Sequence, residues 1–132
     1  MKGECLCKSV VLEIAHDGGF EACHCGMCRQ WGGGPFLGIH TQSYTVLAGH
    51  HSIGVFSSSD WAERGFCTKC GTHLFYHLKP TDEYKVPLGL FQAEEAFEFR
   101  EQIFIDRKPS TYEFSNPTGL LTEQQVFEKF GA

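Results

Sequence analysis

Apolar residues along this chain recur in short stretches that are separated by glycine-rich turns. Within residues 9–15, Val10, Leu12 and Ile14 fall on one face and Val11 and Glu13 on the other, as expected for a half-buried strand. Similar stretches predict strands at residues 36–40, 44–48, 52–56, 73–78, 84–90 and 102–106. Many short strands with such turns predict a mostly β domain built of antiparallel sheets.

One short helix is predicted near the C-terminus. Thr122 can cap its first turn, and Gln125, three residues later, completes a capping box. Gly131 is a typical helix-terminating residue. We expect the helix to dock on the sheets through an apolar face formed by Val126, Phe127 and Phe130.

Length and composition predict one packed domain over residues 1–132. The chain is 42% hydrophobic and contains twelve Phe, which favours a globular core over disorder. The net charge is -5 and the eleven Lys and Arg are scattered, so no nucleic-acid partner is expected. No apolar run is long enough for a signal peptide or a membrane span, which predicts no membrane partner and a cytoplasmic location. Oligomeric state is not accessible from the sequence.

All seven cysteines fall in three clusters, and this spacing predicts metal binding. Thiols stay reduced in the cytoplasm, so clustered cysteines there indicate metal ligands before disulfides. The most economical division places a structural zinc on Cys5, Cys7, Cys67 and Cys70. A second zinc on Cys23, Cys25 and Cys28 would keep an open fourth position, as catalytic zinc sites do.

Two other divisions of the cysteines remain open at this point. The two CxxC pairs, Cys25 with Cys28 and Cys67 with Cys70, could form a zinc ribbon and leave three cysteines unused. Alternatively, one structural zinc could be accompanied by three thiols that bind metal only transiently.

The cysteine motifs resemble those of the glutathione-dependent formaldehyde-activating family, which includes the centromere-protein-V-like proteins. The resemblance spans roughly residues 3–112, with Trp31, Gly33 and Phe36 at further expected positions. It rests on three motifs: Gly3-Glu4-Cys5-Leu6-Cys7, Cys23-His24-Cys25-Gly26-Met27-Cys28-Arg29 and Phe66-Cys67-Thr68-Lys69-Cys70-Gly71-Thr72-His73-Leu74. It implies an Mss-four-like fold of coiled sheets and two zinc ions divided four plus three. The implied activity is the joining of glutathione to formaldehyde, giving S-hydroxymethylglutathione.

Three positions depart from the family pattern. Lys8 stands where the family commonly has Gly, and Gln30 stands where it has Lys or Arg. The stretch from Gly89 to Gln92 lacks the acidic pair that often follows that glycine. All seven cysteines are retained, so the departures concern the substrate more than the metals.

These observations predict a zinc-dependent carbon–sulfur lyase acting on a small thiol and a small carbonyl compound. The zinc on Cys23, Cys25 and Cys28 would carry the reaction, Arg29 would bind a substrate carboxylate, and Gly33 would place a backbone N–H near the substrate. His24 is expected to point away from the metal. His73 and His77 are interpreted as structural, with a ligand or base role as the alternative.

Two alternatives belong to other functional classes. A non-catalytic binding module stabilised by zinc needs only one tightly bound ion. Thiol redox chemistry needs a cysteine outside the metal sites, and the four-plus-three division leaves none.

Overall fold

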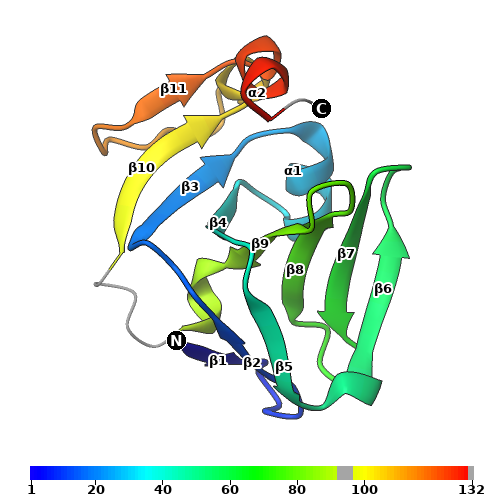
Figure 1. Ribbon diagram of the computed structural model, residues 1–132. Coiled ribbons are helices and arrows are strands. Elements are labelled where there is room, and N and C mark those ends of the chain that lie inside the picture. Colours follow the sequence, from blue (N-terminus) through cyan, green and yellow to red (C-terminus); the bar gives the residue numbers. More distant parts are fainter. Residues whose placement is uncertain (92–96, 131–132) are drawn as a thin grey trace.

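The computed structural model, which describes residues 1–91 and 97–130, is built from two twisted sheets (Figure 1). The smaller sheet has the order β1-β2-β5 and is antiparallel; it consists of β1 (Lys2–Glu4), β2 (Val11–Ile14) and β5 (Tyr44–Ala48). The larger sheet has the order β11-β10-β3-β4-β9-β8-β7-β6. Its strands are β3 (Gly19–Cys23), β4 (Phe36–Thr41), β6 (Ile53–Ser57), β7 (Ala62–Cys67), β8 (His73–Leu78), β9 (Glu83–Pro87), β10 (Glu98–Ile103) and β11 (Gly119–Leu121).

The predicted fold class, mostly β with a short C-terminal helix, is confirmed. The larger sheet differs from the prediction at one side, because β10 pairs in parallel with both β3 and β11. Strands 44–48 and 73–78 have the predicted bounds, 36–40 extends by one residue to Thr41, and 52–56 is shifted by one residue at both ends to Ile53–Ser57. The predicted strand 9–15 is shorter, because β2 spans only Val11–Ile14, but the predicted alternation holds, since Val10, Leu12 and Ile14 are all buried.

Two predicted strands end earlier than expected. The segment 84–90 is a strand only to Pro87, which has no N–H for a further ladder bond, and Leu88–Leu90 form a 3₁₀ turn, η2. The segment 102–106 belongs to β10 only to Ile103. Phe104 then takes a left-handed φ of 55°, and Ile105–Arg107 form the 3₁₀ turn η4.

Four strands were not predicted. Strands β1 and β11 have three residues each, too few for a periodic pattern. Strand β3 begins at Gly19, which the sequence places in a turn, and β7 carries the adjacent charges Glu63 and Arg64. A charged pair inside a strand suppresses the alternation on which the prediction depends.

The predicted C-terminal helix is confirmed as α2 (Glu123–Phe130), including its capping box. The backbone N–H of Gln125 donates to Thr122 Oγ1 (3.3 Å), and the N–H of Thr122 donates to Gln125 Oε1 (2.8 Å). On its apolar face Val126 is buried and Phe127 is largely exposed. Gly131 and the side chain of Phe130 lie outside the described part of the chain, so their predicted roles stay predictions.

A second helix, α1 (Gly26–Gly32), was not predicted. It begins directly after Cys25, whose Sγ accepts a hydrogen bond from the N–H of Cys28 (3.4 Å). It ends at Gly33, which has the left-handed φ of 86° that favours glycine. Three glycines in a row follow the metal-binding motif, and the sequence therefore indicated a turn. A helix of only seven residues has too few apolar positions to show a helical period in the sequence.

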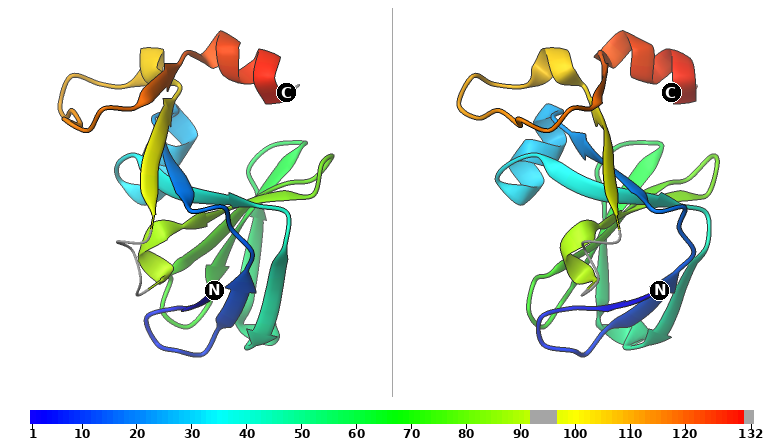
Figure 2. Two further views of the ribbon diagram at one scale, coloured as in Figure 1. Left: turned by 60° about the vertical axis from the view of Figure 1, so that its left-hand side comes forward. Right: turned by 90° about the vertical axis from the view of Figure 1, so that its left-hand side faces the viewer.

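The buried residues form two clusters of unequal size. The main core lies between the two sheets and includes Cys5, Cys67 and the fully buried Phe91. The smaller cluster contains Cys23, Cys28, Ile103 and Val126, where β3, β10, α1 and α2 meet. Figure 2 shows the separation: β10, β11 and α2 form the upper end of the molecule and the small sheet the lower end. Among the described residues no helix combines the length and apolar character that crossing a bilayer requires.

Candidate metal centres

The seven cysteine sulfurs gather in two groups, as the economical division predicted. One contains Cys5, Cys7, Cys67 and Cys70, and the other Cys23, Cys25 and Cys28; within each, all sulfurs lie within 4.8 Å of one another. The zinc-ribbon pairing is therefore wrong, because the two CxxC pairs belong to different groups. Zn–S bonds of about 2.3 Å in a tetrahedron separate the sulfurs by about 3.8 Å. Cys7 Sγ lies 3.6 Å from Cys5 Sγ and 3.8 Å from Cys67 Sγ, so this donor set fits a tetrahedral thiophilic ion such as zinc.

The four-sulfur group joins the loop after β1 to the β7–β8 hairpin. Cys5 and Cys67 are buried, Cys70 is half-buried and Cys7 is exposed. Neutral groups form hydrogen bonds with its sulfurs: the N–H of Val10 donates to Cys5 Sγ (3.3 Å), and hydroxyls of Ser9 and Thr72 lie 3.3 and 3.2 Å from the sulfurs of Cys7 and Cys70. Hydrogen bonds from Thr72 lower the pKa of Cys70 to about 5, which favours a ligating thiolate. Gly71, directly after Cys70, has a left-handed φ of 78°, which favours glycine.

The three-sulfur group lies where β3 passes into α1. Cys23 ends β3, Cys25 caps α1 and Cys28 lies in the first turn of the helix. Hydrogen bonds from the thiols of Cys23 and Cys28, and from the Cys28 N–H, lower the pKa of Cys25 to about 2. The same sharing of protons, together with burial, raises the pKa of Cys23. Negative charge is thus favoured on Cys25, with the Cys28 N–H at the start of α1 as one of its donors.

Arg64, in β7, is a part of this centre that sequence reasoning missed. Its Nη1 and Nη2 lie 3.6 and 3.7 Å from Cys28 Sγ, and the residue is only 3% exposed. Its guanidinium lies between the rings of Trp31 and Tyr76, 5.0 and 4.9 Å from their centroids. Among the described residues no carboxylate lies within ion-pair distance of Arg64. A buried cation without a counterion costs several kcal/mol, so the thiolates are the compensating charge.

The signal for Arg64 was present in the local sequence but weak. Alternation within β7 puts Arg64 on the same face as the buried Ala62, and the two are separated by Glu63. Only the pairing of β7 with β8, which sets Arg64 opposite Tyr76, shows that this face turns toward the cysteines.

The histidines take the structural roles expected of them. His24 is fully buried and points away from the sulfurs; its ring nitrogens lie 2.7 Å from Tyr112 Oη and 2.9 Å from Gln102 Oε1. His73 stacks on Trp31 with ring centroids 3.8 Å apart. His77 lies between Glu63 (3.0 Å) and Asp82 (2.7 Å). Within the described chain, both sulfur groups consist of cysteines alone.

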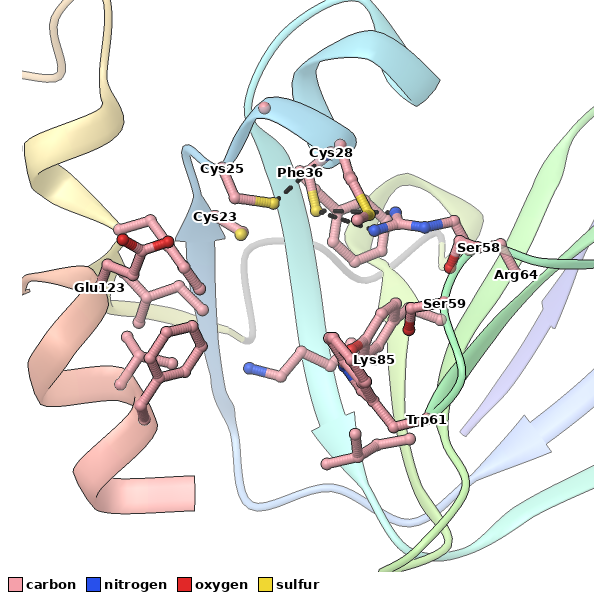
Figure 3. Close-up of a pocket in the computed structure, with 18 of the residues that line it drawn as sticks. Cys23, Cys25, Cys28, Phe36, Ser58, Ser59, Trp61, Arg64, Lys85 and Glu123 are labelled. Carbon is pink, nitrogen blue, oxygen red and sulfur yellow. Dashed lines mark hydrogen bonds between the residues drawn. The ribbon is translucent and has the colours of Figure 1, made fainter. Parts of the chain in front are cut away.

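A cavity of about 440 Å³ opens beside the three-sulfur group (Figure 3). In Figure 3 the three cysteines lie at one end, with Glu123 of α2 on one side and Ser58, Ser59 and Trp61 on the other. Most of the wall is apolar, and its charged members are Arg64, Glu83, Lys85 and Glu123. All four have partners: Lys85 pairs with Glu21, Arg64 contacts Cys28, Glu83 lies 3.4 Å from His40 and Glu123 lies 2.6 Å from Arg107.

Arg29 and Gly33, predicted to bind substrate, line a second hollow of about 350 Å³. Arg29 Nε donates to the carbonyl oxygen of His24 (3.0 Å), and the N–H of Gly33 donates to the carbonyl oxygen of Arg29 (2.8 Å). The wall of this hollow is formed by Gly26, Arg29, Gln30, Gly33, Gly34, Pro109, Thr111 and Tyr112. Gly26 borders both spaces, so the two lie next to each other across the start of α1.

The chain is similar in sequence and in fold to known proteins. A family profile described as glutathione-dependent formaldehyde-activating enzyme matches residues 1–107. An uncharacterised lyase of Schizosaccharomyces pombe is 33% identical over 129 residues, which cover 96% of this chain and 94% of the yeast protein. A crystal structure of a Rhodobacter sphaeroides protein has the same fold, with a TM-score of 0.62 and 23% identity over 70% of this chain and 89% of the other.

Proposed function

Because this chain belongs to the glutathione-dependent formaldehyde-activating enzyme family, we propose that it is a carbon–sulfur lyase-type enzyme that adds a thiol to a small aldehyde, or reverses that addition. The family points to glutathione and formaldehyde as the reactants, with S-hydroxymethylglutathione as the product. The observation that carries the proposal is the contrast in ligand number: three sulfurs face a cavity, while four lie together against the main core.

We assign a zinc ion to each sulfur group, a structural one to the four and a catalytic one to Cys23, Cys25 and Cys28. When bound at the three-sulfur group, zinc would lower the pKa of a substrate thiol and hold the thiolate in place. Arg64 offsets the negative charge that the thiolates accumulate, because its guanidinium lies against Cys28. A substrate that covers the apolar cavity wall would exclude water and thereby strengthen these electrostatic contacts.

Arg29 and Gly33 extend the proposed site into the second hollow. The hollow adjoins the cysteines through Gly26, and Arg29 can pair there with a carboxylate of a glutathione-like thiol. The N–H of Gly33 already donates to the carbonyl oxygen of Arg29. Gly33 would therefore contribute room for the substrate, because it has no side chain, and not a hydrogen bond from its N–H.

The enzyme and the non-catalytic binding module differ in metal content and in the use of the cavity. The binding module needs only the four-sulfur site. The redox alternative has no support, because all seven cysteines fall within the two groups.

The deciding experiment follows exchange between free glutathione, formaldehyde and their adduct by NMR, with and without the protein. We expect faster exchange with wild type and none above background with Cys28→Ser. Elemental analysis should give two zinc ions per chain in wild type and one in Cys28→Ser. One zinc in both proteins, together with unaccelerated exchange, would favour the binding module.

A further inference from the structure

The two neighbouring hollows differ in the chemistry of their walls. The second hollow presents polar groups of Arg29, Gln30, Thr111 and Tyr112. The wall of the larger cavity is mostly apolar, and its apolar side chains come from three parts of the fold. They come from α1 and β4 (Met27, Phe36), from the region of β10 and α2 (Ile103, Phe104, Val126, Phe127), and from the strands opposite (Trp61, Leu78).

Large apolar side chains are also exposed at this cavity. Met27, Trp61 and Phe127 are 50%, 48% and 43% exposed, and all three line it. Exposed apolar side chains around a concave space mark ligand-binding sites in soluble proteins. Because the cysteines lie at one end, the reacting group of a bound ligand is directed there and its remainder fills the apolar space (Figure 3).

Formaldehyde does not match this space. It is little larger than a water molecule, which occupies about 30 Å³ in the liquid, whereas the cavity measures about 440 Å³. It also has no apolar group that could cover the side chains of the wall. Occupied by formaldehyde alone, most of the wall would remain in contact with water.

The body of a glutathione-like thiol does not match the larger cavity either. Two carboxylates and an ammonium group would need partners there, and burying them unpaired is costly. Arg64 and Lys85, the cations of the wall, already contact Cys28 and Glu21. The polar hollow across Gly26 offers Arg29, so the charged body fits on that side and leaves the apolar cavity to the other reactant.

We propose that the carbonyl substrate carries an apolar alkyl or aryl group that occupies the cavity between α2 and Trp61. This inference rests on the proposed addition of a thiol to an aldehyde. In that step the sulfur forms a bond to the carbonyl carbon, the C=O double bond becomes a C–O single bond, and the thiol proton ends on the oxygen. The apolar group takes no part in the bond changes and supplies binding alone.

The first test measures protein-catalysed exchange of glutathione with formaldehyde, ethanal, butanal and hexanal by NMR, each relative to its uncatalysed rate. Each buried methylene contributes about 0.8 kcal/mol, so kcat/KM should rise about fourfold per methylene until the cavity is full. Accelerated exchange of formaldehyde with no gain for longer aldehydes would overturn this inference and leave the proposed function standing. No acceleration with any of the four would overturn both.

A second test separates binding from chemistry by using unreactive alcohols. Titration with ethanol, butan-1-ol and hexan-1-ol should change the emission of Trp61, one of two tryptophans in the chain, with an affinity that rises with chain length. Binding of this kind without catalysis of any aldehyde would support the apolar site and overturn the proposed reaction. Absence of a chain-length trend would count against the site even if formaldehyde exchange is accelerated.

Matched variants locate the effect. Phe127→Ala removes a wall residue and should lower the ratio of hexanal to formaldehyde kcat/KM by about tenfold, which corresponds to loss of most of a buried phenyl contact. Phe56→Ala removes a more exposed phenyl group on β6, outside the residues that line the cavity, and should leave the ratio unchanged. Equal effects of the two substitutions would contradict the assignment of the cavity.

Discussion

The two cysteine groups use the same ligand atoms in different surroundings. The four-sulfur group lies against the main core, has neutral hydroxyl and N–H neighbours, and connects segments about sixty residues apart. The three-sulfur group borders a cavity, begins a helix and contacts the buried cation of Arg64. A closed ligand set in neutral surroundings suits structure, while an open set beside a compensating cation suits the binding of a further anion.

The largest difference between the groups should appear in folding. Cys67→Ser removes a ligand that is also a fully buried core residue. A structural zinc site contributes about 10 kcal/mol or more to folding, comparable with the whole stability of a small domain. We expect an unfolded or aggregated protein by circular dichroism. A native spectrum with a cooperative melt would show that the four-sulfur group is not structural.

Loss of a ligand from the other group should affect activity more than folding. Cys28→Ser should retain a native spectrum and lose roughly 1–3 kcal/mol of stability, because its sulfur lies in the smaller cluster. It should also lose one of two zinc ions and all catalysed exchange. Unfolding as complete as that of Cys67→Ser would remove the distinction between the two groups.

Arg64 provides a test of the electrostatic part of the comparison. Arg64→Met keeps much of the volume between Trp31 and Tyr76 but removes the charge. Zinc affinity at the three-sulfur group should fall about 10–100-fold, measured by competition with a chromogenic chelator, while the four-sulfur group is unaffected.

Two further variants complete this test. Arg64→Lys should recover part of the lost affinity. Arg29→Met, which removes a cation that does not contact a sulfur, should leave zinc affinity nearly unchanged. Equal losses for Arg64→Met and Arg29→Met would mean that general positive charge, and not the contact with Cys28, is responsible.

Backbone strain at the four-sulfur group predicts a smaller effect of opposite sign. Lys8, where the family commonly has Gly, has a left-handed φ of 65° and donates its N–H to the carbonyl oxygen of Cys5 (2.9 Å). A non-glycine residue in this region costs about 1 kcal/mol, so Lys8→Gly should raise the melting temperature by a few degrees. Lys2→Gly, in a strand, serves as a control for the loss of a lysine and should be mildly destabilising.

The smallest effect concerns pH and His73, which stacks on Trp31 beside Arg64. Burial, together with the charge of Arg64, lowers the pKa of His73 below its ordinary value of 6.5. The unfolded chain therefore takes up a proton more readily, so stability is complete above about pH 6.5 and falls as the pH drops below it. Between pH 7.5 and pH 5.5, the free energy of unfolding measured with denaturant should fall less for His73→Gln than for wild type. His51→Gln, on the exposed turn η1, should behave as wild type.

The fold could be predicted where local patterns are strong. Val10, Leu12 and Ile14 alternate across β2 and the residue before it, and Thr122 with Gln125 forms a complete capping signal, so β2 and α2 were found. Helix α1 was missed because it has only seven residues and ends among glycines. Strand β7 was missed because a buried arginine cannot be distinguished from an exposed one by the residues next to it in the sequence.

The three cysteine clusters are a property of the sequence itself. Ligands within each cluster are two or three residues apart, so local geometry brings the sulfurs of one cluster together, and the count of seven favours four plus three. Tertiary structure decided which clusters combine, because it brings Cys7 to Cys67 across sixty residues and leaves Cys23, Cys25 and Cys28 as a separate group. Tertiary structure decided what surrounds each set. Arg64 reaches Cys28 from 36 residues away, and the cavity needs α2, about a hundred residues farther along the chain. Burial, desolvation and charge compensation of a group depend on every segment that packs around it. The spacing of residues within one segment does not determine which other segments those are.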